Sequence, residues 1–156
     1  KLFFASTSEI YGKNIKNSFS ENDDRLLGPT SINRWSYSTS KAMIEHYLYA
    51  LKQESLIDFV GIRIFNAYGP RLNARVVSKF LDCAKHKKSM IIHGDGSQKR
   101  CFTYISDIID AIKKIVENKK NFGQFYNVGN PNEEYSIKEL ALMVQNLCEK
   151  TCDIKY

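Results

Sequence analysis

The stretch FASTSEIYG, residues Phe4–Gly12, sets the end of an apolar strand directly against hydroxyls and a carboxylate. The apolar run starts at Leu2 and the polar side chains begin at Ser6. Burying polar groups is costly unless they are hydrogen-bonded or put to use. The stretch therefore indicates either a plain loop or a polar site at the end of a strand.

Strand-like apolar runs alternate with helical periodicity along the rest of the chain. We expect strands over 2–5, 59–65 and 125–128, and helices over about 35–55, 76–85, 105–116 and 136–147. Residues 90–92 and 99–104 flank an Asp95-Gly96 turn, which is typical of a β-hairpin. The alternation predicts an α/β fold with a largely parallel sheet.

Composition excludes several classes of protein. The 156 residues are 43% apolar and 26% charged, which is ordinary for a globular domain. No apolar run approaches the roughly 18 residues of a membrane span, so we expect no membrane partner. The net charge of +6 is scattered, without the clustered basic and aromatic residues that nucleic-acid binding needs. The four cysteines lack metal-site spacing, so we expect no metal and a reducing cytoplasmic location.

A candidate catalytic pair lies at the start of the long helix expected over about 35–55. Tyr37 and Lys41 are one helical turn apart on the same face. A lysine beside a tyrosine lowers the pKa of the phenol, which then becomes a usable acid or base near neutral pH. The alternative is that Tyr37 belongs to the apolar stripe of the helix, with Lys41 extending outward to solvent. That stripe comprises Met43, Ile44, Tyr47, Leu48 and Leu51.

Further polar residues follow the ends of two expected strands. Thr7 and Glu9 lie just beyond the first strand, and Asn66 lies just beyond the second. Ligands of doubly wound sheets bind outside the carboxyl ends of the strands. We therefore expect these residues and the Tyr37–Lys41 helix to reach one crevice.

Four segments in order resemble the extended short-chain dehydrogenases/reductases, in the branch of nucleotide-sugar epimerases, dehydratases and decarboxylases. They are STSEIYG, RWSYSTSK, RIFNAYGPR and GDGSQKRCFTYISDIIDAI, and the resemblance covers essentially the whole chain. It implies that NAD takes a hydride from C4 of a nucleotide sugar to give a 4-keto sugar. Tyr37 would remove the hydroxyl proton, and Lys41 would tune Tyr37 and hold the nicotinamide ribose.

The resemblance also assigns roles around the sugar. Thr7 would hydrogen-bond the reacting hydroxyl, and Glu9 would act after the oxidation, as a base or by orienting a carboxylate. The residues that it places at the substrate are Ser8, Asn66, Arg75 and Arg100. Asn66 and Arg100 would bind the diphosphate, which suits the planar fork of arginine. Structural alternatives stay open: Asn66 as a strand-end cap, Arg75 and Arg100 as solvated surface residues, and Arg63 as a structural residue inside a strand.

Position 8 bears on the reaction. Many hexose 4,6-dehydratases carry Asp there, whereas the Thr-Ser-Glu triplet of this chain resembles UDP-glucuronate decarboxylases. A 4-keto group makes the C5 carboxylate of such a sugar a β-keto acid, which loses CO₂ readily. The resemblance thus favours UDP-glucuronate decarboxylation. A 4,6-dehydratase, a 4-epimerase and a non-catalytic nucleotide-sugar binding fragment remain open.

The glycine-rich fingerprint of the family, Gly-x-x-Gly-x-x-Gly, does not occur in this sequence. We expect the C-terminal part of a Rossmann-like doubly wound sheet, without its N-terminal dinucleotide-binding half. Residues 1–70 would hold the catalytic motifs, and 71–156 the smaller substrate-binding region, with 104–130 returning to the sheet. The full-length protein would be a homodimer, and this part alone would be inactive.

Overall fold

The computed structural model describes residues 1–16, 18–73, 75–148 and 152–156. The chain forms two compact units, and each is assembled from separate stretches of sequence. Residues 1–65 and 106–129 make the first unit, and residues 66–105 and 130–156 make the second. The chain thus passes from one unit to the other after residues 65, 105 and 129. The substrate-binding and cofactor-binding roles expected for these parts stay predictions.

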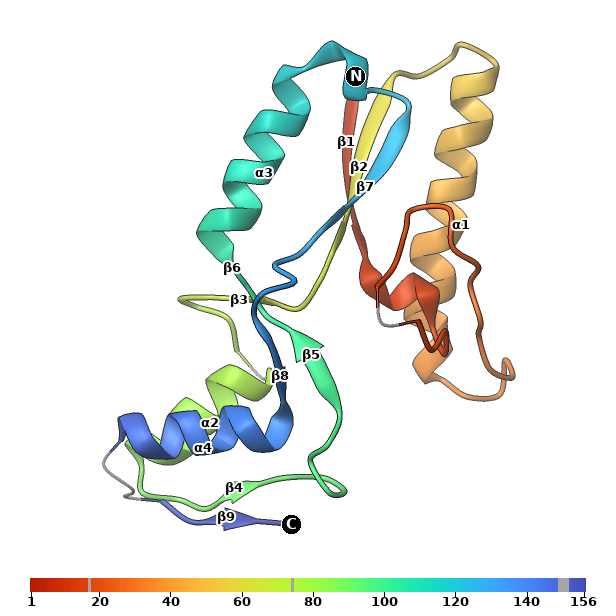
Figure 1. Ribbon diagram of the computed structural model, residues 1–156. Coiled ribbons are helices and arrows are strands. Elements are labelled where there is room, and N and C mark those ends of the chain that lie inside the picture. The colour runs from red at the N-terminus through yellow and green to blue at the C-terminus, as the bar shows by residue number, and fades with distance from the viewer. Residues whose placement is uncertain (17, 74, 149–151) are drawn as a thin grey trace. The chain divides into compact units, whose positions relative to one another are not determined.

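The first unit is built on a parallel sheet in the order β1-β2-β7 (Figure 1). Its elements are β1 (Leu2–Thr7), the short 3₁₀ helix η1 (Ser8–Tyr11), α1 (Arg34–Gln53), β2 (Phe59–Ile64), most of α3 (Ile105–Glu117), the 3₁₀ helix η2 (Lys119–Asn121) and β7 (Gln124–Val128). Ile64 at the end of β2 pairs with Thr7 on one side and Val128 on the other. The three strands therefore end at the same edge, and the predicted α/β class with a parallel sheet is confirmed.

The core of this unit lies around β2, whose first five residues are all buried. Leu48 of α1 packs into a cluster with Phe59 and Phe125. Gly61 leaves room for the Phe125 ring on the neighbouring strand, because a Cβ at position 61 would lie 2.2 Å from that ring. Figure 1 shows α1 and α3 on opposite sides of the sheet, as in a doubly wound fold.

The buried face of α1 differs from the apolar stripe expected for it. Its buried residues are Ser38, Ala42, Glu45 and Leu48. Met43, Ile44, Tyr47 and Leu51 are exposed, so of the expected stripe only Leu48 is in the core. The helix turns a partly polar face to the sheet because β2 presents a buried arginine there, Arg63, which needs a charged partner.

The second unit combines short strand pairs with two helices. Its elements are β3 (Ala67–Tyr68), α2 (Val76–Lys85), β4 (Met90–Ile91), β5 (Lys99–Cys101), β6 (Thr103–Tyr104), β8 (Glu134–Ser136), α4 (Ile137–Leu147) and β9 (Ile154–Lys155). The strands β3 and β6 pair in parallel, as do β4 and β9, while β5 and β8 pair antiparallel. Its core includes Phe80 of α2, Met90 of β4 and Leu140 of α4. Ser136 and Glu139 form a capping box at the start of α4.

The hairpin expected over 90–104 is wrong. Asp95 and Gly96 do lie in a turn, where the Asp95 carboxylate accepts hydrogen bonds from the backbone and side chain of Ser97. However, β4 pairs with β9 and β5 pairs with β8, both of which come from the C-terminal part of the chain. The local turn signal is present, but the strands that flank it bind more distant partners.

Within the described residues, no helix has both the length and the apolar character to cross a membrane.

Candidate functional site

The polar stretch after β1 is built into the fold through its hydroxyl groups. Thr7 is buried, and its Oγ1 accepts a hydrogen bond of 3.2 Å from the backbone N–H of Glu9, which caps η1. A threonine hydroxyl that accepts in this way keeps its own hydrogen for donation to a ligand. Ser8 is partly buried, and the side chain of Glu9 is exposed. The arrangement places the Thr7 hydroxyl and the exposed Glu9 side chain two residues apart at the end of the strand.

The Tyr37–Lys41 pair lies on α1, which packs against this part of β1. Lys41 Nζ donates a hydrogen bond of 2.9 Å to the carbonyl of Ala5 and lies 6.0 Å from the centre of the Tyr37 ring. The Tyr37 side chain is 45% exposed, so the alternative that it is a core residue is wrong. One turn of helix therefore presents a phenol to solvent with an ammonium group beside it.

A second contact joins α1 to the polar stretch. Ser38 Oγ donates a hydrogen bond of 2.7 Å to the carbonyl of Glu9. Together with the Lys41–Ala5 bond, it holds the start of α1 against the segment that carries Thr7 and Glu9. The structure thus brings the four predicted catalytic residues of the first unit onto two segments that are bonded to each other.

A buried ion pair lies beneath these residues. Arg63 of β2 bonds Glu45 of α1 at 2.6 Å through Nη2, and Nε lies 3.2 Å from each carboxylate oxygen. Both residues are buried, so Arg63 has the structural role expected from its place inside a strand. Glu45 also accepts a hydrogen bond from Ser6 Oγ. Sequence reasoning missed Glu45, although an arginine inside a buried strand implies a carboxylate partner.

The other side of Arg63 contacts η1 and the loop after it. Nη1 donates to Tyr11 Oη at 2.8 Å and to the carbonyl of Glu21 at 2.7 Å. Burial lowers the pKa of the Arg63 guanidinium, but its bonds to Glu45 and Tyr11 outweigh this, and the pKa is raised. Burial raises the pKa of the Tyr11 phenol, with Arg63 opposing the change. Tyr11 is therefore a neutral hydrogen-bonding group at physiological pH.

The remaining predicted site residues lie in the second unit. Asn66 is exposed with a φ of 35°, a conformation that asparagine tolerates better than most residues. Arg75 is exposed at the start of α2, and Arg100 is exposed on β5 opposite Tyr135 of β8. Arg100 Nη1 donates to the carbonyl of Lys99 at 2.8 Å. The roles of Ser8, Asn66, Arg75 and Arg100 at a substrate stay predictions.

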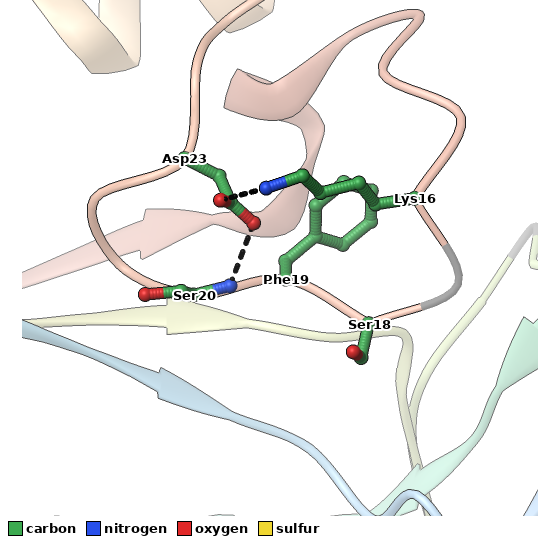
Figure 2. Close-up of a pocket in the computed structure, with 5 residues that line it drawn as sticks. All are labelled: Lys16, Ser18, Phe19, Ser20 and Asp23. Atoms are coloured by element: carbon green, nitrogen blue, oxygen red, sulfur yellow. Dashed lines mark hydrogen bonds and ion pairs between the residues drawn. The ribbon is translucent and has the colours of Figure 1, made fainter.

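An open pocket of about 500 Å³ lies in the loop between η1 and α1 (Figure 2). It is lined by Lys16, Ser18, Phe19, Ser20 and Asp23. The Asp23 carboxylate is bonded to Lys16 and accepts from the backbone N–H of Ser20 at 2.8 Å, which together hold its pKa below the ordinary value. None of the predicted site residues lines it. Among the described residues that line the pocket, the Lys16 ammonium group and the Asp23 carboxylate are paired with each other.

Among the residues that the structure describes, no group of three or more histidine, cysteine, aspartate or glutamate side chains is arranged to hold a metal ion.

Comparison with known proteins matches residues 1–129 to the model of the "NAD dependent epimerase/dehydratase family". A UDP-N-acetyl-alpha-D-glucosaminuronate decarboxylase of Bacillus cytotoxicus is 39% identical over 158 aligned positions, which cover 99% of this chain and 48% of the relative. The chain therefore spans about half the length of this curated relative.

Solved structures agree with this match. The PbgP3 protein of Burkholderia pseudomallei superposes with a TM-score of 0.88 at 32% identity, over 97% of this chain and 52% of that protein. A UDP-glucuronic acid 4-epimerase of Bacillus cereus, solved with UDP-glucuronic acid and NAD, gives a TM-score of 0.86 at 28% identity, over 98% of this chain and 47% of that one. The fold of the described chain is thus that of about half of each of these proteins.

Proposed function

Because this chain belongs to the NAD dependent epimerase/dehydratase family, we propose that it carries the acid–base part of an enzyme that converts a UDP-sugar through a 4-keto intermediate. The observation that carries the proposal is the solvent-facing Tyr37 phenol, with the Lys41 ammonium group tied to the end of β1 beside it. A cation fixed beside a phenol favours its phenolate form, and a phenolate is a suitable proton acceptor for a sugar hydroxyl.

The residues of the first unit fit the nicotinamide-ribose end of an NAD site. Tyr37 and Lys41 supply a hydroxyl and an ammonium group on one exposed face of α1, which is a donor set suited to ribose hydroxyls. The glycine-rich turn that would hold the pyrophosphate is not part of this sequence. NAD, when bound, supplies hydride transfer at C4 of the sugar.

The chain's own residues would handle the protons. Tyr37, as a phenolate that the neighbouring Lys41 stabilises, accepts the proton of the C4 hydroxyl and becomes a neutral phenol. Thr7 donates its free hydroxyl hydrogen to the reacting oxygen. Glu9, whose side chain is exposed at the same end of β1, orients the substrate carboxylate or a water molecule for the second step.

For the second step we propose decarboxylation of a UDP-hexuronate. Once C4 is a ketone, the bond between C5 and the carboxylate carbon breaks, CO₂ leaves, and the electron pair forms an enolate that is protonated at C5. Two observations support this choice. The chain has the Thr-Ser-Glu triplet rather than the Asp of many dehydratases at position 8. The Bacillus cytotoxicus relative also carries the name of a UDP-uronate decarboxylase.

We also propose that the full-length protein is a homodimer through α1. The exposed face of this helix carries Met43, Ile44, Tyr47 and Leu51, which form an apolar strip on the surface of the first unit. Contiguous apolar surface of this kind marks interfaces. A second copy of the same helix offers a self-complementary apolar face.

The test is turnover by the full-length protein with NAD. UDP-glucuronate, UDP-N-acetylglucosaminuronate and UDP-glucose are supplied in separate reactions, and the products are followed by CO₂ release and mass spectrometry. We expect CO₂ and the corresponding UDP-sugar from at least one uronate. Loss of water from UDP-glucose, or an isomer without CO₂, would reject decarboxylation. No conversion of any of the three would reject the proposed function.

A further inference from the structure

We propose that Glu45 is a positioning residue, which fixes α1 on the sheet so that Tyr37 and Lys41 stand at the carboxyl end of β1. This inference rests on the proposed function, because it concerns the same acid–base pair. Glu45 itself is 5% exposed and is two helical turns from Tyr37, so it acts through the helix and does not touch the reacting atoms.

Glu45 makes hydrogen bonds to two strands of the sheet. Its carboxylate accepts a hydrogen bond from Ser6 Oγ on β1 and three from Arg63 on β2, the shortest of which is 2.6 Å. One side chain of α1 is therefore bonded to two adjacent strands at once. Because a buried carboxylate is costly without such partners, any shift of the helix along the sheet carries a high penalty.

The contacts of α1 and η1 with β1 fall at neighbouring residues of this strand. Ala5, Ser6 and Thr7 are consecutive. The carbonyl of Ala5 accepts from Lys41, the hydroxyl of Ser6 donates to Glu45, and the hydroxyl of Thr7 caps the turn that holds Glu9. Glu45 thus bonds to Ser6. This residue lies between Ala5, which Lys41 contacts, and Thr7, which is proposed to bond the reacting hydroxyl.

The Tyr37 phenol is positioned by the helix that carries it. Tyr37 is nearly half exposed, so its own packing gives it little support. Its position follows from the position of the helix, which is set by polar contacts at Ser38, Lys41 and Glu45. Of these three, the Glu45 contact is the buried ion pair. Hydrogen bonds depend steeply on distance and angle, so these contacts constrain the position of the helix.

The hydrogen bonds of Arg63 also reach η1. Arg63 bonds Glu45 on one side and Tyr11 on the other, and Tyr11 is the last residue of the 3₁₀ turn that carries Glu9. Arg63 therefore links α1, which carries Tyr37 and Lys41, to η1, which carries Glu9. Loss of Glu45 breaks this link at α1, while the bond between Arg63 and Tyr11 of η1 does not involve Glu45.

The experiment compares Glu45→Gln with Leu48→Ala in the full-length protein. Leu48 is 5% exposed on the same helix face, but it packs into the apolar cluster with Phe59 and Phe125. We expect Glu45→Gln to lower kcat by about 10- to 100-fold, the effect of a small misplacement of catalytic groups. The KM for the UDP-sugar should change less than about threefold, because Glu45 does not contact substrate. Leu48→Ala should destabilise the fold but keep kcat within about threefold of wild type when measured on folded protein.

A double variant separates positioning from stability. Glu45→Gln combined with Arg63→Gln removes both buried charges, so it should recover much of the stability that Glu45→Gln alone loses. We expect its kcat to stay as low as that of Glu45→Gln. Recovery of kcat together with stability, or an equal kcat loss in Leu48→Ala, would overturn the proposal, as would a Glu45→Gln enzyme with wild-type kcat.

A readout without turnover keeps this proposal distinct from the proposed function. Hydrogen–deuterium exchange of the peptide over residues 36–44 should be faster by about tenfold in Glu45→Gln than in wild type, and faster in Glu45→Gln than in Leu48→Ala when the two variants are compared at equal free energy of unfolding. If the wild-type protein converts no UDP-sugar, the proposed function fails and the exchange result still decides the role of Glu45. Equal exchange in Glu45→Gln and wild type would overturn it.

Discussion

Tyr37 is held by the backbone of α1 and stands next to Lys41, whose ammonium group is in turn tied to the carbonyl of Ala5. The hydroxyl of Tyr37 is thus the part of the pair that is free to exchange a proton with a ligand. It can be removed without disturbing a core contact, because the side chain is partly exposed. Removal of the Tyr37 hydroxyl should therefore change turnover without changing the free energy of unfolding.

We predict that Tyr37→Phe lowers kcat by at least about 10²-fold, because a positioned acid–base group contributes about 10²- to 10⁴-fold. The free energy of unfolding should change by less than about 0.5 kcal/mol, as for an ordinary surface substitution. The measurements are UDP-sugar turnover and urea denaturation of the full-length protein.

Tyr49→Phe is the matched control for this variant. Tyr49 lies on the same helix and is 41% exposed, but it packs on Phe59 and Phe125, away from the predicted site residues. Its kcat should match wild type. Turnover by Tyr37→Phe at the wild-type rate would show that another group takes the proton.

Single residues also mark the limit of inference from sequence. The four-residue spacing of Tyr37 and Lys41 predicts a shared helix face, and the structure has both residues on α1 beside β1. Glu45 continues this spacing, but its pairing with Arg63 depends on how α1 packs on β2, which no local pattern contains. An arginine inside a buried strand indicates that some carboxylate pairs with it, but the sequence does not indicate that this carboxylate belongs to Glu45.

At the scale of elements, predictions succeed where local periodicity decides the outcome. The bounds of α2, Val76–Lys85, are those expected from its pattern, and α1 and α3 agree within two residues. The hairpin over 90–104 is wrong because β4 and β5 are each only two or three residues long. Such short strands take whichever partner the tertiary fold supplies, here β9 and β8.

The start of α4 gives a prediction that depends on pH. The Glu139 carboxylate accepts a hydrogen bond of 2.7 Å from the backbone N–H of Ser136, and this bond, with the Ser136 side chain, lowers the pKa of Glu139 below its ordinary value of 4.5. A carboxyl whose pKa is lowered on folding stabilises the fold above its unfolded pKa. This stabilisation is lost as the pH falls through the folded pKa.

We therefore predict that Glu139→Gln reduces the free energy of unfolding relative to wild type at about pH 6, and that the difference shrinks steadily towards about pH 3. Urea denaturation of both proteins across this range is the measurement. Groups that titrate alike in both proteins cancel in the difference. A gap that stays constant with pH would show that the capping carboxylate does not contribute through its charge.

At the scale of the whole molecule, the apolar strip on α1 bears on assembly. The sequence predicts an apolar stripe on this helix, but periodicity alone does not distinguish a face that packs on the sheet from one that packs on a second copy. In the structure the stripe is mostly exposed, and a polar face with Glu45 meets the sheet instead. The full protein is thus expected to cover the strip by dimerisation.

The corresponding prediction is that Tyr47→Lys, which places a charge in the middle of the strip, shifts the full-length protein from dimer to monomer. Burying an unpaired charge in an apolar interface is strongly unfavourable. Light scattering coupled to size-exclusion chromatography gives the mass of each species. Leu142→Lys on α4, also an exposed apolar position, is the control and should leave the mass unchanged. A Tyr47→Lys protein that remains dimeric would place the interface elsewhere.

The chain passes between the two units three times, and this affects what happens when the backbone is cleaved. A cut between residues 65 and 66 yields two pieces, and the second piece contains β7 as well as the whole second unit. In the folded protein β7 is paired along its length with β2, which belongs to the first piece. The break in the covalent chain is therefore bridged by the hydrogen bonds of a buried strand pair. A nicked molecule of this kind comes apart only when the sheet itself unfolds.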